Sequence, residues 1–223
     1  MTRDTRTDPA EQGRNRRERI LDAAMTTFAG RGYRDASMDD IASAAETSKG
    51  GVYFHFPTKE SIFRELMRTT ADKLVAKVER EVGTESDPIA QAEIAIRTVL
   101  ATFAGHRTMA RLLFLDVIGA GRVFQTEANE LHERFARLIA GYLDQAVAEG
   151  VIGPIDTRIT SIAWFGALNE VVGRWLLADR PGRLEDAFPA LRAMLLRSVG
   201  VPEARVMSVP SPVSPGTFPE TSR

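Results

Sequence analysis

The chain has 223 residues, no cysteine and a formal net charge of −1 at pH 7. The lack of cysteine excludes disulfides, thiolate nucleophiles and cysteine-based metal sites. The hydrophobic content of 43% is typical of globular protein, and the length suits a small domain plus a medium one. The N-terminus is polar, and no apolar run approaches about 18 residues. We therefore expect no signal peptide, no membrane span and a cytoplasmic location.

Both ends of the chain are expected to be disordered. Residues 1–13 contain no apolar side chain except Met1 and Ala10, and residues 201–223 hold five of the 11 prolines. Segments of this kind have little apolar surface to bury, and proline interrupts helices. The folded part of the chain is predicted to be residues 14–200.

Between these ends, apolar residues recur with helical spacing and no alternating strand pattern is found. A first helix carries a stripe from Ile20 to Phe28 and ends at Gly30 and Gly32. Ser37 begins a second helix, with Asp40 as its capping-box partner. A third, very short helix covers 48–56 and ends before Pro57. These three helices predict a compact unit at 14–56.

Thr58 is a good N-cap for a fourth helix, whose apolar stripe runs from Ile62 to Val78. Further helices are expected at roughly 88–104, 107–119, 126–149, 156–178 and 184–199. Breaks at Gly150–Pro154 and Asp179–Gly182 separate the last three. The sequence therefore predicts an all-α chain of about nine helices, with an α-bundle at 57–200.

The most informative segment is 37–59, which places two short helices around a tight turn at Glu46–Thr47. Gly50 and Gly51 each cost a helix interior about 1 kcal/mol relative to alanine, which close approach to another surface would justify. A helix N-terminus also attracts phosphate through its free N–H groups. Lys49, Tyr53, His55 and Lys59 can add cations or hydrogen-bond donors. Val52 and Phe56 suit the core, whereas Phe54 fits either the core or a flank beside DNA.

Segment 16–66 resembles the DNA-binding domain of the TetR family. The matching residues are Arg17, Ile20, Leu21, Ala23, Ala24, Phe28, Gly32, Ile41, Ala42, Ala45, Ser48, Lys49, Gly50, Tyr53, His55, Phe56, Lys59 and Glu60. The resemblance implies a helix-turn-helix DNA-binding domain at 14–56 and a helical ligand-binding and dimerisation domain at 57–200. The expected DNA-binding residues are Arg17, Ser37, Thr47, Ser48, Lys49, Gly50, Gly51, Tyr53, His55 and Lys59.

Two positions depart from the family pattern. Glu46 occupies the place of a turn glycine, so either the turn has another geometry or Glu46 takes an unfavourable positive φ. Gly51 stands where many relatives have a side chain that can reach base edges, so phosphate contacts and groove shape are expected to carry much of the recognition. An arginine cluster begins the first helix (Arg14, Arg16, Arg17 and Arg19), and it suits phosphate contact and a solvated face about equally.

The C-terminal domain is implied by the family to hold an apolar pocket and to dimerise through its last two helices, about 156–178 and 184–199. The stripes on these helices permit a four-helix interface, although they also suit intrachain packing. Candidate ligand-binding residues are Phe103, His106, Leu112, Phe114, Phe135, Trp164, Phe165 and Asn169. Aromatic groups with few polar partners are typical of ligand cavities, and plain core packing is the alternative for each. The polar Asn169 and Glu170 need partners, which Arg174 could also supply.

The predicted function is a dimeric TetR-type repressor that binds a palindromic operator and is released by a small, mostly apolar ligand. The alternatives are a sequence-tolerant DNA-binding protein or an activator without a ligand and, least favoured, a helical enzyme. His132 and Glu133 are not followed by the second histidine of a zinc protease, and neither catalytic residues nor a cofactor are predicted. His106, Asp116 and His132 make only a weak case for a metal, so no metal site is predicted.

Overall fold

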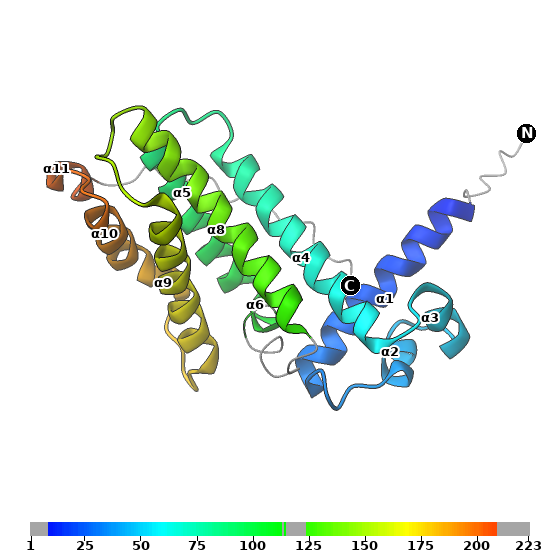
Figure 1. Cartoon of the computed structure of the whole chain (residues 1–223). Coiled ribbons are helices and arrows are strands. Elements are labelled where there is room, and N and C mark those ends of the chain that lie inside the picture. The colour runs from blue at the N-terminus through cyan, green and yellow to red at the C-terminus, as the bar shows by residue number, and fades with distance from the viewer. Residues whose placement is uncertain (1–8, 113, 115–123, 209–223) are drawn as a thin grey trace, which may run out of the picture. The chain divides into compact units, whose positions relative to one another are not determined.

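In a computed structural model, the described residues are 9–112, 114 and 124–208, with side chains described from residue 15 onward. Across these ranges the regular structure is entirely helical, which confirms the predicted all-α class (Figure 1). The chain divides into two compact units. Unit 1 comprises residues 1–70 and 108–127, and unit 2 comprises residues 71–107 and 128–223. No helix within the described ranges is both long and apolar enough to cross a membrane.

Unit 1 contains three N-terminal helices and the first half of a fourth. They are α1 (Pro9–Arg31), α2 (Met38–Ala44), α3 (Lys49–His55) and the start of α4 (Lys59–Val82). Residues 9–13 were expected in a disordered arm, but α1 already includes them. Proline suits a helix start, where its missing N–H needs no partner, so Pro9 does not prevent helix formation.

The predicted caps of α2 and α4 are confirmed. Ser37 accepts a hydrogen bond from the Asp40 N–H at 3.1 Å, and the Asp40 carboxylate accepts one from the Ser37 N–H at 2.9 Å. Thr58 Oγ1 likewise accepts from the Ser61 N–H at 3.1 Å. These reciprocal bonds satisfy N–H groups that the first helical turn leaves without partners.

An aromatic cluster forms the core of unit 1 and includes a residue far along the chain. The ring centroids of Phe63 lie 5.5 Å from Phe28, 4.8 Å from Tyr33 and 4.6 Å from Phe124. Phe124 is fully buried, and the following Glu127 forms an ion pair with Arg64. The compact unit is therefore larger than the predicted 14–56, because the start of α4 and a segment before α8 complete its core.

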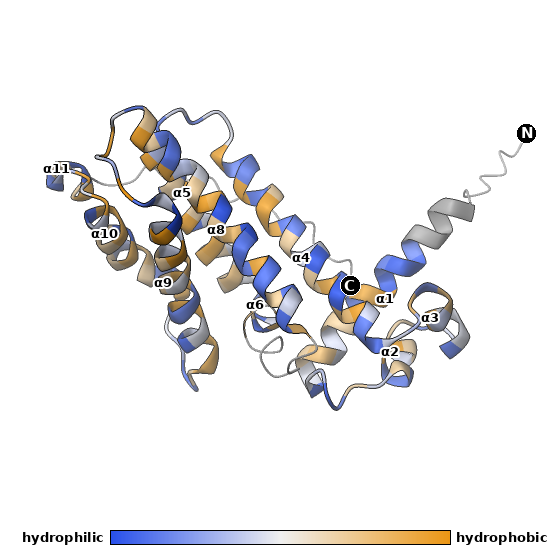
Figure 2. Cartoon of the chain, in the orientation of Figure 1, coloured by the Kyte–Doolittle hydropathy of each residue, from blue (hydrophilic) through white to orange (hydrophobic). Residues whose placement is uncertain are grey.

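Unit 2 contains the rest of α4 and most of the later helices. They are α5 (Pro88–Gly105), α8 (Gln125–Ala148), α9 (Thr157–Leu177), the 3₁₀ helix η3 (Leu184–Ala187) and α10 (Phe188–Ser198). The predicted helix at 184–199 is thus two elements. The predicted helix at 107–119 is described only as α6 (Arg107–Arg111), and its later part lies mostly outside the described residues. In Figure 2, polar and apolar bands alternate along α4 and α8, as amphipathic helices require.

The predicted C-terminal tail is partly folded. Residues 203–206 form a one-turn helix, α11 (Glu203–Val206), and Val201 and Val206 are buried. The Arg192 guanidinium holds this turn by donating to the carbonyl oxygens of Arg205, at 3.1 Å, and Val206. The same group pairs with Glu93 at 2.8 Å. Residues 209–223, also assigned to the tail, lie outside the described residues.

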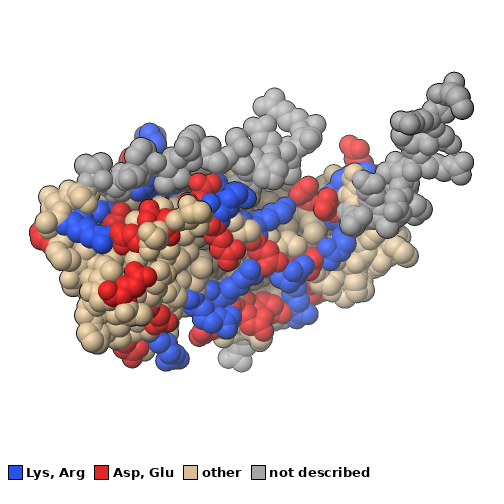
Figure 3. Space-filling model, turned by 90° about the horizontal axis from the view of Figure 1, so that it is seen from above, with Lys and Arg blue, Asp and Glu red and all other residues tan. Residues whose placement is uncertain are grey.

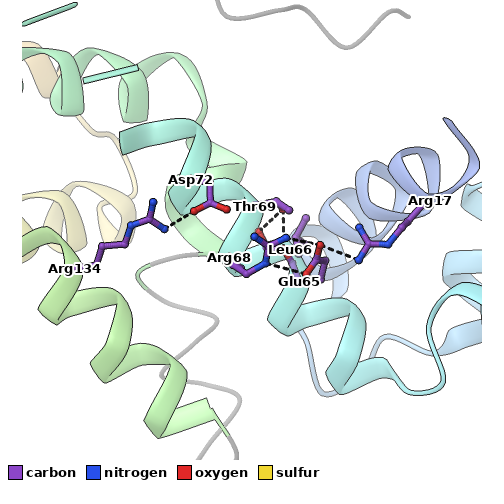
Figure 4. A network of polar contacts seen from close by, with 7 residues as sticks. All are labelled: Arg17, Glu65, Leu66, Arg68, Thr69, Asp72 and Arg134. Atoms are coloured by element: carbon purple, nitrogen blue, oxygen red, sulfur yellow. Dashed lines mark hydrogen bonds and ion pairs between the residues drawn. The ribbon is translucent and has the colours of Figure 1, made fainter. Parts of the chain in front are cut away.

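Ion pairs connect α4 with helices on either side of it in the sequence (Figure 4). The Glu65 carboxylate lies 2.8 Å from both Arg17 of α1 and Arg68. These contacts lower the pKa of Glu65, with the Arg68 hydrogen bond as the largest cause. Further along α4, Asp72 pairs with Arg134 of α8. Since the groups are partly exposed, each pair adds little stability and mainly fixes side-chain orientation.

Candidate DNA-binding site

The α2–turn–α3 segment is a helix-turn-helix whose turn depends on Glu46. Glu46 has φ of +50°, and it is the only non-glycine residue with positive φ among the described residues. The N–H of Thr47 donates to Ala42 O at 3.0 Å and that of Glu46 to Ser43 O at 3.1 Å. This pair of bonds defines a Schellman motif, in which the left-handed position is usually glycine. The turn therefore keeps its usual geometry, and Glu46 bears the strain.

Helix α3 presents one buried face and one exposed face. Val52 is fully buried and Phe56 is 3% exposed, as predicted. On the opposite face, Tyr53 is 44% and Phe54 86% exposed. Phe54 is a candidate that the sequence left undecided, because helical spacing alone could not separate a core position from a flank. An exposed aromatic ring here can contact sugars or a thymine methyl group.

The two glycines at the start of α3 differ in their surroundings. A Cβ built on Gly50 would have only Ser48 Oγ nearby, at 4.0 Å, whereas one on Gly51 would lie 2.7 Å from Thr47 Oγ1. Ser48 caps the helix by accepting from the Gly51 N–H at 3.1 Å. Packing within the chain therefore gives Gly51 a partial reason to be glycine and gives Gly50 none. An approaching external surface is a sufficient reason at Gly50.

Neighbouring groups shift the pKa values of Lys49 and His55 in the free protein. Lys49 Nζ lies 2.9 Å from the Asp39 carboxylate, and this bond raises the pKa of Lys49. Burial, followed by the charges of Arg16 and Arg17, lowers the pKa of the half-buried His55. His55 is therefore neutral near pH 7 and carries a single N–H donor.

Lys59, which is predicted to contact phosphate, has partners within the chain. Its ammonium donates to three carbonyl oxygens, those of Tyr33 and Ala36 at 2.8 Å and Arg34 at 3.1 Å. An ammonium has three donors, so all of them are used within the chain. Lys59 joins α4 to the loop after α1, and a phosphate contact would compete with these three hydrogen bonds.

Two members of the N-terminal arginine cluster also make contacts inside unit 1. Arg17 pairs with Glu65 and lies 4.9 Å from the centroid of the Phe56 ring, and Arg19 donates to Ala45 O at 2.8 Å. Arg16 is exposed, and the side chain of Arg14 lies outside the described residues. On the face drawn in Figure 3, Lys and Arg side chains are mixed with Asp and Glu.

The predicted ligand-binding residues fall in both units. Leu112 and Phe114 belong to unit 1, and the other six belong to unit 2. Phe135 and Phe165 are brought together, with stacked rings 6.0 Å apart, and His132 lies 5.1 Å from Phe165. Burial lowers the pKa of His132. The structure thus brings two of the predicted ligand-binding residues, Phe135 and Phe165, into contact.

The remaining candidates in unit 2 lie on α5, at its C-terminal end and on α9. Trp164 is buried and donates to Ser198 Oγ at 3.0 Å, so it joins α9 to α10. Phe103 is buried on α5, His106 is exposed at the end of that helix, and Asn169 is half-buried. Glu170, which needed a partner, forms an ion pair with Arg174.

The two helices predicted to form the dimer interface retain exposed apolar side chains. On α9, Ile159 is 55%, Ile162 42% and Leu177 70% exposed, and on α10 Met194 is 49% exposed. Gly166 lies in the same exposed stripe of α9. Large apolar groups clustered on one surface are typical of interaction sites.

The helical fold and the exposed second helix of a helix-turn-helix define a DNA-binding regulator with a separate helical domain. A family model described as "Bacterial regulatory proteins, tetR family" matches residues 20–66. A second, "Tetracyclin repressor-like, C-terminal domain", matches residues 85–197. The chain belongs to the TetR family of bacterial transcriptional regulators.

Relatives and solved structures agree with this assignment. The transcriptional repressor KstR2 of Mycolicibacterium smegmatis is 34% identical over 201 residues, covering 80% of this chain and 93% of its own. The fatty acid metabolism regulator protein of Bacillus subtilis is 23% identical, covering 76% and 88%. FadR from Bacillus halodurans has a TM-score of 0.78 at 23% identity, covering 89% of this chain and 100% of that one. FadR from Bacillus subtilis, solved with stearoyl-CoA, has a TM-score of 0.75 at 22% identity, covering 82% and 97%.

Proposed function

We propose that this protein is a dimeric repressor that binds a palindromic operator and releases it when an acyl-CoA thioester binds unit 2. The exposed face of α3 carries the DNA-binding part of the proposal. Lys49, Gly50, Tyr53 and Phe54 lie at the accessible start and outer side of a helix whose other face is buried. Ser48 and Thr47 stand at the same N-terminus, where backbone N–H groups can approach phosphate.

The contacts divide into two kinds. Lys49, Tyr53 and the N–H of His55 are assigned to phosphate oxygens, with Arg16, Arg17 and Ser37 on the flank. Thr47, Ser48 and the backbone at Gly50 and Gly51 are assigned to the major groove. Because few side chains reach base edges, groove shape contributes strongly to operator choice.

Dimerisation is proposed through the exposed apolar faces of α9 and α10. Burying Ile162 and Met194 against a second copy would remove apolar surface from water, which favours association. Gly166 permits close approach of two helices at the centre of the α9 stripe. A dimer presents two copies of α3, which matches a palindromic site with half-sites about 34–36 Å apart.

The ligand proposal rests on relatives whose names concern fatty acids and on the stearoyl-CoA complex of one of them. In this chain, the Phe135–Phe165 pair offers an apolar surface suited to an acyl chain. Both α4 and α8 continue from one unit into the other. A change in α4 on ligand binding can therefore reach α1 through the ion pair of Glu65 with Arg17.

The test is DNase footprinting of purified protein on the promoter region of its own gene, repeated with stearoyl-CoA. We expect a discrete palindromic footprint that the thioester weakens, and reciprocal weakening of thioester binding by operator DNA. Tyr53→Phe should weaken binding to all sequences alike, and Ile162→Arg should yield monomers with weak operator binding. A diffuse footprint that stearoyl-CoA leaves unchanged contradicts the proposal.

A further inference from the structure

Helix α5 carries an unusual set of buried polar atoms. Within the described ranges, the buried side-chain oxygens without a hydrogen-bond partner are Gln91 Oε1, Thr98 Oγ1, Thr102 Oγ1 and Glu127 Oε2. Three of these four residues lie on α5. Thr98 is 5% and Thr102 1% exposed, so neither hydroxyl is satisfied by bulk water. Since buried hydroxyls are nearly always hydrogen-bonded, each requires an explanation.

Threonines elsewhere in the chain behave differently. A helical threonine commonly donates to the carbonyl oxygen one turn earlier. Thr27 does so to Ala23 at 2.8 Å, and Thr69 does so to Glu65 at 2.8 Å (Figure 4). Thr98 and Thr102 make no such bond. Their hydroxyls are therefore available to a group outside α5.

The two threonines share one side of α5, because residues four apart lie one turn from each other. The other side of α5 contacts α10. Glu93 pairs with the buried Arg192 of α10 at 2.8 Å, and the Arg97 guanidinium lies 4.9 Å from the Phe188 ring centroid. By helical geometry, Thr98 and Thr102 lie roughly opposite this contact face. The two buried hydroxyls therefore belong to the side of α5 that faces away from the α5–α10 contact.

We infer that Thr98 and Thr102 bind an oxygen atom on the acyl chain of the ligand, so that unit 2 selects hydroxy- or keto-acyl thioesters over plain hydrocarbon chains. This inference rests on the proposed acyl-CoA ligand. A saturated chain beside these hydroxyls would leave both unsatisfied, whereas a chain oxygen would satisfy them. The thioester oxygen is less suited, because it adjoins the hydrated coenzyme A group and these hydroxyls are deeply buried.

The test compares stearoyl-CoA with sets of positional isomers of monohydroxystearoyl-CoA and monoketostearoyl-CoA, using calorimetry on the full chain. We expect at least one oxygenated isomer to bind the wild-type protein about tenfold more tightly than stearoyl-CoA. The double variant Thr98→Val/Thr102→Val keeps the side-chain shape and removes both hydroxyls. It should lose this preference while binding stearoyl-CoA with unchanged or higher affinity. Thr69→Val, which removes a hydroxyl bonded within its own helix, should keep the wild-type preference.

Several results would overturn the inference. Equal affinity for all probes in the wild-type protein refutes the oxygen preference and leaves the acyl-CoA proposal standing. Equal losses for stearoyl-CoA and the isomers in the double variant would assign the hydroxyls to the thioester. A lower melting temperature with unchanged preference would assign them to internal water. Failure of the wild-type protein to bind any probe would refute the proposed ligand as well.

Discussion

Lys49, the first residue of α3, forms an ion pair with Asp39, and its Nζ lies 2.9 Å from the carboxylate. This N-terminal end of α3 is the part assigned to DNA. The pair places a negative charge where a phosphate is expected. Asp39→Asn should therefore strengthen operator binding about threefold at low salt and steepen the salt dependence. The measurement is a salt titration of operator affinity by fluorescence anisotropy. Asp35→Asn removes the same charge from an exposed position of unit 1, and an equal gain there would assign the effect to net charge alone.

Glu46 bears backbone strain that a glycine would relieve. Glu46→Gly should raise the free energy of unfolding by about 1 kcal/mol, since left-handed backbone costs an L-residue roughly that amount. Urea denaturation measures the change. Glu46→Ala is the control, because it removes the carboxylate and keeps the Cβ. A gain in the alanine variant equal to that of glycine would show that the charge is responsible.

A substitution at Gly50 should change fold stability and operator affinity in opposite directions. Gly50→Ala should stabilise the free protein by up to about 1 kcal/mol through helix propensity, because a Cβ there has only Ser48 Oγ nearby, at 4.0 Å. The same methyl group should reduce operator affinity about tenfold if the backbone of α3 touches DNA. Gly141→Ala, at an exposed position of α8, should give a similar stabilisation without loss of affinity. Unchanged operator affinity in Gly50→Ala would contradict the proposed close approach of the α3 backbone to DNA.

His55 should make operator binding depend on pH. Burial and the charges of Arg16 and Arg17 lower its pKa in the free protein, whereas a nearby phosphate favours the protonated ring and raises it. Affinity should therefore rise as pH falls through the bound pKa, by up to about tenfold per pH unit between the two pKa values. The measurement is operator affinity from pH 8 to pH 5.5, in about half-unit steps, at constant ionic strength. His55→Gln should flatten the profile, and a wild-type slope retained in this variant contradicts the assignment.

Lys59 is expected to affect stability and not DNA affinity. Lys59→Met leaves the carbonyl oxygens of Tyr33, Arg34 and Ala36 without their donor, which should cost about 2 kcal/mol of unfolding free energy. The slope of operator affinity against salt should remain that of wild type, since no phosphate contact is lost. Lys73→Met, at an exposed position of α4, is the matched control for loss of charge. A shallower dependence of operator affinity on salt in Lys59→Met, but not in Lys73→Met, would support the phosphate contact of Lys59.

The sequence by itself determined the helices and the DNA-binding segment, because both depend on local spacing. Helical periodicity placed Val52 and Phe56 in the core, and the caps at Ser37 and Thr58 follow from side chains that bond within one turn. The TetR pattern at 16–66 was recognisable for the same reason.

Only the tertiary structure decided which side chains meet across long stretches of chain. Lys59 looked like a free cation until the fold placed it beside three carbonyl groups more than 20 residues earlier. Phe124 completes the core of unit 1, and Thr98 and Thr102 differ from other threonines through their surroundings. Such outcomes depend on packing between distant segments, and local sequence patterns carry no information about those contacts.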